Sequence, residues 1–102
     1  MAAERCESLA QIRERIDALD RSIVEFLAQR GEYVRQAAAF KRDAADVRAP
    51  DRAAAVIDNA GRMAAEAGAD RAVIERIYRE IVAAYTDAEL VQHASKISSR
   101  QC

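Results

Sequence analysis

Two cations and one carboxylate occupy positions where the hydrophobic pattern of this sequence predicts buried side chains. Arg30 falls in register with the apolar residues Ile23 and Ala37, and Lys41 follows eleven residues later, or three helical turns. Glu89 continues an inward-facing stripe in the C-terminal half of the chain. A charge in a packed helical seam is costly unless an opposite charge meets it. These residues are therefore candidates for binding a charged ligand.

A third cation lies beside the same seam. Arg13 is about 100° around the helix from Arg30, so it would reach the pocket of a chain running alongside more easily than its own. Lys41 is one of two lysines among 16 basic residues, and it is therefore more informative than a typical arginine of this chain. Because arginine makes bidentate contacts with carboxylates, the set predicts a small dicarboxylate substrate.

Each of these charges also has a purely structural interpretation. Arg30 would pair with a carboxylate such as Asp20 or Glu80 across a dimer. Glu89 would pair with Arg13 or Arg30 near the end of its helix. The pattern alone leaves the structural and the ligand-binding interpretations open.

Composition predicts a single all-helical domain over residues 1–102. Of the 102 residues, 51% are hydrophobic, which is enough to form a core, and three glycines and one proline are too few for the turns of an all-β fold. A net charge of −1 gives no general basis for binding nucleic acid. The absence of an apolar leader and of a membrane-length apolar run predicts a cytoplasmic protein.

Metal and disulfide chemistry find little support in the sequence. Cys6 and Cys102 lie near opposite ends of the chain, so we expect free thiols. His93 lies near the polar C-terminal segment, where we expect a surface residue, and there is no HExxH motif. We therefore expect neither a metal nor another cofactor.

The periodicity of apolar residues predicts three helices, one long, one short and one medium. The first covers residues 8–42 with Ser8 as its N-cap, and its apolar seam follows a heptad spacing. The second begins near Pro50 and ends at Gly68, and the third begins after Asp70 and fades after Val91. The helical core would cover about residues 8–92, followed by a polar tail over 95–102.

The first helix is too long for a globule of this size. At 1.5 Å per residue, residues 8–42 would extend about 52 Å, whereas a compact domain of this length is only about 35 Å across. The apolar seam nevertheless continues along the whole helix. We therefore expect a second copy to cover it, giving an intertwined homodimer.

Two motifs of the first helix resemble those of the all-helical chorismate mutase family. Residues Ile12–Asp20 resemble the opening motif of the family, Leu27–Arg30 resemble the second, and Lys41 follows at the family's spacing. The resemblance extends from Leu9 to about Val91. It implies an intertwined helical homodimer with two active sites and no cofactor.

The resemblance also implies roles for the charged residues. Arg13 of the partner subunit and Arg30 would clamp the two carboxylates of chorismate, while Lys41 would donate to the ether oxygen whose bond breaks. Glu89 would assist catalysis only when it is protonated, because a carboxylate repels the negative charge that develops on that oxygen. The expected reaction is the rearrangement of chorismate to prephenate.

A related activity is the main alternative. Residues Val47–Arg52 resemble a loop of the isochorismate pyruvate lyases, and Ala53 and Ala54 replace an arginine and a glutamate of ordinary mutases. Against the lyase, Glu89 stands where lyases and bacterial mutases have glutamine, and fungal mutases have glutamate. A third possibility is a helical dimerisation or regulatory module without activity. The further residues expected to contact the substrate are Pro50, Asp51, Arg52, Val82 and Tyr85.

Overall fold

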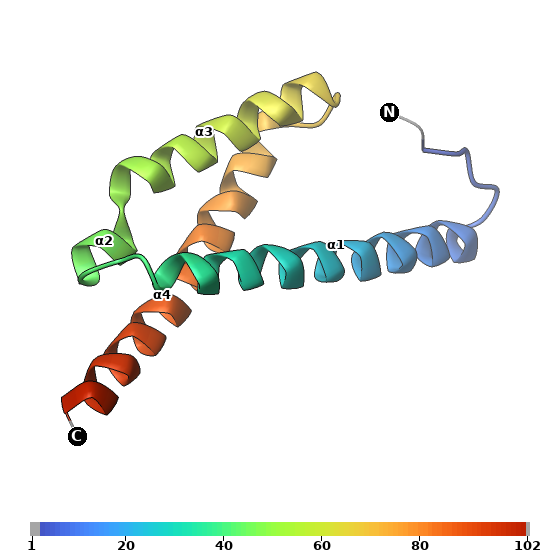
Figure 1. The fold of residues 1–102 in the computed structure, drawn as a ribbon. Coiled ribbons are helices and arrows are strands. Elements are labelled where there is room, and N and C mark those ends of the chain that lie inside the picture. The colour runs from blue at the N-terminus through green and yellow to red at the C-terminus, as the bar shows by residue number, and fades with distance from the viewer. Residues whose placement is uncertain (1–2, 102) are drawn as a thin grey trace. The chain divides into compact units, whose positions relative to one another are not determined.

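The computed structural model describes residues 3–101, and the side chains of residues 3–95. Within that range the regular structure is entirely helical, which confirms the predicted fold class. Three helices correspond to the predicted ones, and a short additional helix, α2, lies in the segment expected to separate the first two. The helices are α1 (Leu9–Ala38), α2 (Ala44–Arg48), α3 (Pro50–Glu66) and α4 (Arg71–Gln101), as labelled in Figure 1.

The chain divides into two units between Tyr33 and Val34. The first unit contains the N-terminal segment and most of α1, and the second contains the end of α1 with α2, α3 and α4. The start of α1 is capped as predicted. The Ser8 hydroxyl accepts the Gln11 N–H at 3.1 Å, and the Gln11 side-chain oxygen accepts the Glu7 N–H at 2.9 Å. The first bond satisfies an amide group in the first turn that has no intrahelical partner, and the second fixes the residue that precedes the cap.

The first unit, a single helix, cannot cover its own apolar seam. At 1.5 Å per residue, the 30 residues of α1 extend about 45 Å. Leu19, Ile23 and Phe26 are 63%, 53% and 67% exposed. Protein surfaces ordinarily carry single, scattered apolar residues, whereas here exposed apolar side chains form a continuous stripe.

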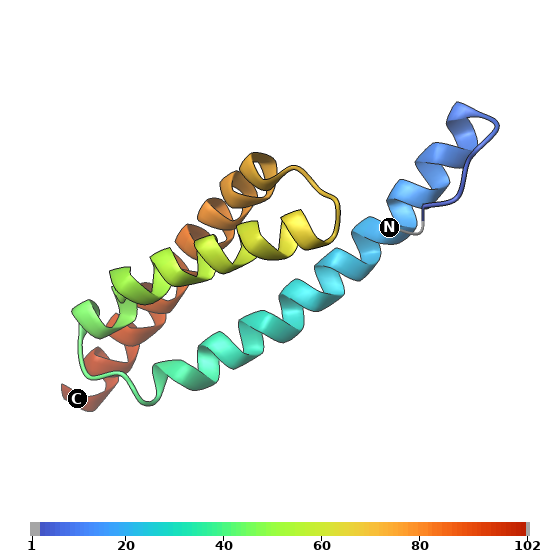
Figure 2. The same cartoon turned by 90° about the horizontal axis from the view of Figure 1, so that it is seen from above.

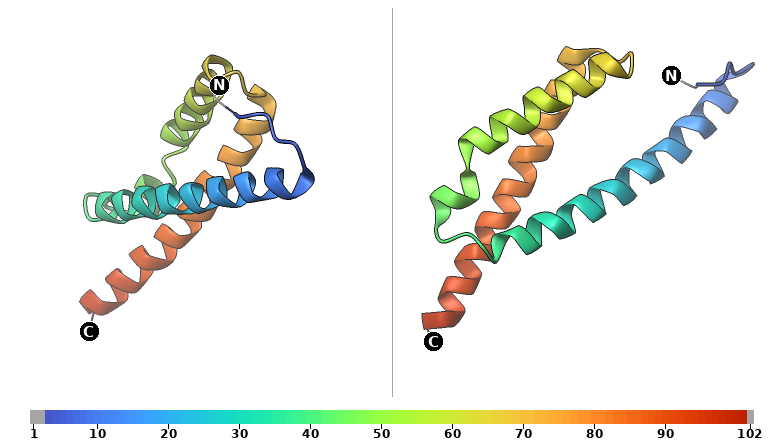
Figure 3. Two further views of the ribbon diagram at one scale, coloured as in Figure 1. Left: turned by 90° about the vertical axis from the view of Figure 1, so that its right-hand side faces the viewer. Right: turned by 45° about the horizontal axis from the view of Figure 1, so that its top comes forward.

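In the second unit, α3 and α4 form an antiparallel helical hairpin, and the two helices lie side by side in Figures 2 and 3. The turn between them follows the predicted signals. Gly68 adopts a left-handed conformation, with φ of 75°, and the Ala69 N–H donates to the Ala64 carbonyl at 2.8 Å. Such an ending favours glycine, which has no Cβ to clash. Asp70 caps α4 by accepting the N–H groups of Ala72 and Val73.

Small side chains allow α3 to approach α4. Ala60 and the adjacent Gly61 lie about one turn before Ala64 on the same side of α3, and all three are buried. A Cβ atom at residue 61 would collide with the ends of the Arg71 and Glu75 side chains of α4. Glycine at this position therefore leaves room for a polar contact across the hairpin.

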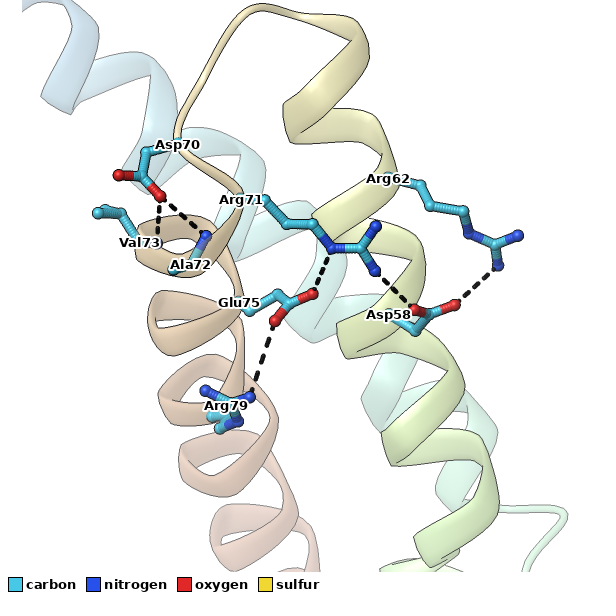
Figure 4. A network of polar contacts seen from close by, with 8 residues as sticks. All are labelled: Asp58, Arg62, Asp70, Arg71, Ala72, Val73, Glu75 and Arg79. Carbon is cyan, nitrogen blue, oxygen red and sulfur yellow. Dashed lines mark hydrogen bonds and ion pairs between the residues drawn. The ribbon is translucent and has the colours of Figure 1, made fainter.

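That contact is a network of ion pairs, shown in Figure 4. The Arg71 guanidinium donates to Asp58 of α3 and to Glu75 of its own helix, both at 2.8 Å. Arg62 and Arg79 extend the network at its two ends. Because most of these side chains are exposed, each pair contributes only about 0–1 kcal/mol. The network connects α3 to α4 at the surface of the hairpin, while the small residues of α3 lie in its interior.

The C-terminal helix continues beyond the predicted limit. The expectation that it fades after Val91 is wrong, because α4 runs to Gln101 and includes most of the predicted polar tail. Residues 92–101 contain neither glycine nor proline, so nothing local interrupts the helix. None of the described helices has the length and apolarity needed to cross a membrane.

Two further expectations concern single residues. Cys6 is a free thiol, as predicted, and Cys102 lies outside the described residues. His93, which we expected at the surface, lies on α4 and is partly exposed.

Candidate functional site

Lys41 lies just beyond the end of α1. The helix expected to reach residue 42 stops at Ala38, and the next N–H groups bond three residues back instead of four. Phe40 N–H donates to the Ala37 carbonyl at 3.0 Å, and Lys41 N–H donates to the Ala38 carbonyl at 3.2 Å. These shorter steps tighten and close the end of a helix. The helical spacing expected between Arg30 and Lys41 is therefore wrong, since Lys41 begins a loop.

An ion pair between Lys41 and Glu89 connects this loop to α4. The Lys41 ammonium donates to both carboxylate oxygens of Glu89, at 3.0 Å to Oε1 and 2.8 Å to Oε2. The Glu89 side chain is 5% exposed and that of Lys41 is 25% exposed. A carboxylate this buried needs a cation or several donors to offset its lost hydration. Glu89 therefore faces inward, as its spacing predicts, with a partner that the sequence did not assign to it.

Two further predicted residues share the inward face of α4. Val82 and Tyr85 precede Glu89 by seven and four residues, which places all three on one side of the helix. Both are half-buried. The second unit thus carries an ion pair next to a half-buried apolar and aromatic surface on the same helix.

Hydrogen bonds within the loop organise the chain that follows Lys41. Asp43 caps α2 by accepting the Asp46 N–H at 2.9 Å. Asp46 in turn accepts the backbone N–H of Arg42 at 3.0 Å and its side-chain Nε–H at 3.1 Å. The backbone bond from Arg42 is the main cause that lowers the pKa of Asp46 below its usual value, followed by the bond from the Arg42 side chain.

The residues of this loop were not predicted as part of the site. Asp43 and Asp46 are three residues apart, a spacing typical of reciprocal capping at a helix start, and this signal could have indicated α2. Val47, which is 3% exposed, is the buried residue of α2, and α2 packs against α4. The short helix therefore attaches the loop to the helix that carries Glu89.

The predicted segment 50–52 forms the first turn of α3. Pro50, Asp51 and Arg52 are exposed there, and proline suits this position because the first helical N–H has no intrahelical partner. Ala49 precedes them in a left-handed conformation, with φ of 36°. Its N–H donates to Ala45 in α2, and its carbonyl accepts the first N–H bond of α3. A non-glycine residue in this conformation before proline is strained, and it fixes the direction in which α3 leaves the loop.

Arg13 and Arg30 lie on α1, in the first unit of the chain. Arg13 is exposed. The role of these two arginines in a site with Lys41 and Glu89 stays a prediction. Among the described residues, no three His, Cys, Asp or Glu side chains gather in a way that could hold a metal ion.

Comparison with known proteins gives two findings. Residues 12–90 match the model of the family described as chorismate mutase type II. The chain is also 40% identical over 79 residues to an isochorismate pyruvate lyase of Pseudomonas aeruginosa, a match that covers 78% of each chain. The matched family segment includes α2 and α3 and contains both Lys41 and Glu89.

The ion pair makes a prediction about stability. The Lys41→Met variant leaves the buried Glu89 carboxylate without its cation, so we expect the free energy of unfolding to fall by about 2–4 kcal/mol at pH 7. Adding Glu89→Leu removes the orphaned charge and should recover part of that loss. Urea denaturation at one fixed protein concentration measures both changes.

Arg76→Met provides the control, because Arg76 is an exposed cation on α4. We expect it to change the free energy of unfolding by less than about 0.5 kcal/mol. Strictly additive losses from Lys41→Met and Glu89→Leu would contradict an energetic coupling between the two residues.

Proposed function

Because this chain belongs to the chorismate mutase type II family, we propose that it converts isochorismate to salicylate and pyruvate. The Lys41–Glu89 pair holds an ammonium group at the edge of a half-buried surface, which suits either reaction of this family. The observation that carries the choice of substrate is the 40% identity to an isochorismate pyruvate lyase. The resemblance of residues 47–52 to a lyase loop supports it as well.

The proposed reaction requires positioning more than reactive groups. The ether bond between the ring and the enolpyruvyl group breaks, one ring hydrogen moves to the enolpyruvyl methylene, and the ring becomes aromatic. No nucleophile takes part in this exchange of bonds within one molecule. The enzyme must therefore fix the flexible arm over the ring and stabilise the negative charge that develops on the ether oxygen.

Lys41 is suited to the second task. An ammonium has three N–H donors, and in this structure the Lys41 nitrogen bonds both carboxylate oxygens of Glu89. With at most two of its donors used in this way, a further N–H would donate to the ether oxygen of the substrate. A preorganised donor at a developing oxyanion contributes about 3–4 kcal/mol to transition-state stabilisation. Glu89 holds the ammonium in place by accepting hydrogen bonds from it with both carboxylate oxygens.

The first task falls to the arginines of α1. Arg30 and Arg13 of the partner subunit would bind the two carboxylates of the substrate, as the family resemblance implies. A guanidinium binds a carboxylate through two parallel hydrogen bonds, which fixes orientation as well as position. Val82 and Tyr85 would pack against the ring from α4, and Pro50, Asp51 and Arg52 would contact it from the start of α3.

The second candidate activity is the rearrangement of chorismate to prephenate, which the sequence alone favoured. The description of the matching family model supports it, and so does Glu89, which the resemblance associates with fungal mutases rather than with lyases. Ala53 and Ala54 weigh against it, because their side chains cannot form the polar contacts with the ring hydroxyl that mutases make. The lyase therefore stands first.

We further propose that the active protein is an intertwined homodimer. Exposed apolar side chains run along α1 and also occur in the second unit, where Phe40 is 88% exposed and Val73 is 52% exposed. Burying apolar area yields roughly 25 cal/mol per Å², so a second copy laid along this stripe would gain substantially. The same arrangement would bring Arg13 of one subunit to the pocket of the other.

Assays on isochorismate and chorismate test the proposed function. We expect the purified protein to release fluorescent salicylate from isochorismate, with a kcat/KM at least about tenfold above that for prephenate formation from chorismate. Lys41→Met should reduce the preferred activity about 100- to 1000-fold, because it removes the donor to the ether oxygen.

The Arg76→Met variant again serves as control and should keep near-normal turnover. Faster turnover of chorismate than of isochorismate would contradict the lyase proposal and favour mutase activity. Turnover of neither substrate would contradict both activities and favour a helical module without catalysis.

A mixing experiment tests the shared site. If Arg13 and Lys41 come from different subunits, a heterodimer of Arg13→Ala and Lys41→Met chains has one intact site and one doubly altered site. Equal co-expression of the two variants should then restore about a quarter of the wild-type activity per site, although each variant alone is inactive. An inactive mixture that nevertheless contains heterodimers would show that both residues act within one chain.

A further inference from the structure

Lys41 is outside any helix, so its position depends on bonds made by the loop. Its own N–H donates to the Ala38 carbonyl at the end of α1. The next peptide group is fixed from the other side, because the Arg42 N–H donates to Asp46 Oδ2 at 3.0 Å. The backbone of Lys41 is therefore restrained on one side by α1 and on the other by a single carboxylate.

The carboxylate that holds Arg42 is itself restrained. The Asp46 N–H donates to Asp43 at the cap of α2, and the Arg42 side chain donates a second bond to Asp46 Oδ2 at 3.1 Å. The next residue, Val47, is 3% exposed, and α2 packs against α4. Asp46 thus connects the backbone beside Lys41 to the helix that carries its partner, Glu89.

Electrostatics add to this geometry. Arg42 is the main cause of the lowered pKa of Asp46, and the positive charge of Lys41 contributes to it as well. Asp46 is therefore ionised at neutral pH, and its charge attracts the Lys41 ammonium from the loop side while Glu89 holds it from α4. The Asp46 side chain is 33% exposed, so water weakens this attraction without removing it.

We propose that Asp46 is a positioning residue for Lys41, holding the loop so that the ammonium stays on Glu89 with one N–H directed at the substrate. The inference rests on the proposed function for its catalytic consequence and on the loop contacts for its structural part. Asp46 does not need to contact the substrate. It acts through the Arg42 peptide group, for which a neutral side-chain oxygen is also an adequate acceptor.

The positioning role predicts different effects for two substitutions of Asp46. Asp46→Ala removes the acceptor, so the Lys41 loop loses its restraint, and we expect kcat to fall about 10- to 100-fold with KM changed less than about threefold. Asp46→Asn keeps an oxygen that can accept the Arg42 N–H, and it should restore most of that loss. Asp58→Ala is the matched control, because Asp58 is an ion-paired aspartate of the α3–α4 network.

A second readout is independent of activity. The chain contains two lysines, so labelling lysine with ¹³C and ¹⁵N gives two side-chain signals, with Lys96 as internal reference. A held ammonium makes the two Hε protons of Lys41 inequivalent. We expect this inequivalence to decrease in Asp46→Ala and to persist in Asp46→Asn and Asp58→Ala.

The outcomes distinguish the proposal from the function on which it rests. Unchanged Lys41 signals in Asp46→Ala would overturn the positioning role, whatever the activity. Altered Lys41 signals in a protein that turns over neither substrate would support the positioning role and contradict the proposed function. A kcat loss that Asp46→Asn does not restore even in part would also overturn the role, since the acceptor for the Arg42 N–H is its main element and the charge only adds to it.

Discussion

The rest of the structure depends on a lysine ammonium held by a nearly buried carboxylate. The Glu89 side chain on α4 is nearly buried, and Lys41 offsets its lost hydration by donating to both carboxylate oxygens. The pair contributes little net stability compared with apolar packing, because both charges lose hydration. This is consistent with the role that we propose for the pair, which is to present a cation at a fixed point.

The elements around the pair can be understood as its supports. The end of α1 closes in a tight turn that releases Lys41 from the helix, and α2 packs the following residues against α4 through Val47. The strained Ala49 directs the chain into α3, whose small residues allow a close hairpin with α4. The long apolar stripe of α1 provides the surface that we propose a second copy covers.

The sequence predicted the helices well because their signals are local. The Ser8 and Asp70 caps, Pro50 at the start of α3 and Gly68 at its end all act within one turn, and each lies where it was predicted. Helix ends without such a signal were predicted poorly: α1 stops earlier and α4 continues further than apolar periodicity indicated.

The site was predictable in part. The inward position of Glu89 follows from helical spacing, which the sequence displays directly. Its pairing with Lys41 spans 48 residues and depends on a tertiary contact that periodicity cannot reveal. Asp43 and Asp46 were missed because an Asp-x-x-Asp pair is common in polar loops, and its importance here comes from the lysine beside it.

A crystal structure with a bicyclic ether dicarboxylate that resembles the transition state tests the central claim most directly. The account predicts the Lys41 ammonium within about 3 Å of the ether oxygen while it still donates to Glu89. A bound ligand whose ether oxygen lies against another donor, or a Lys41 that leaves Glu89 to turn into solvent, would contradict it.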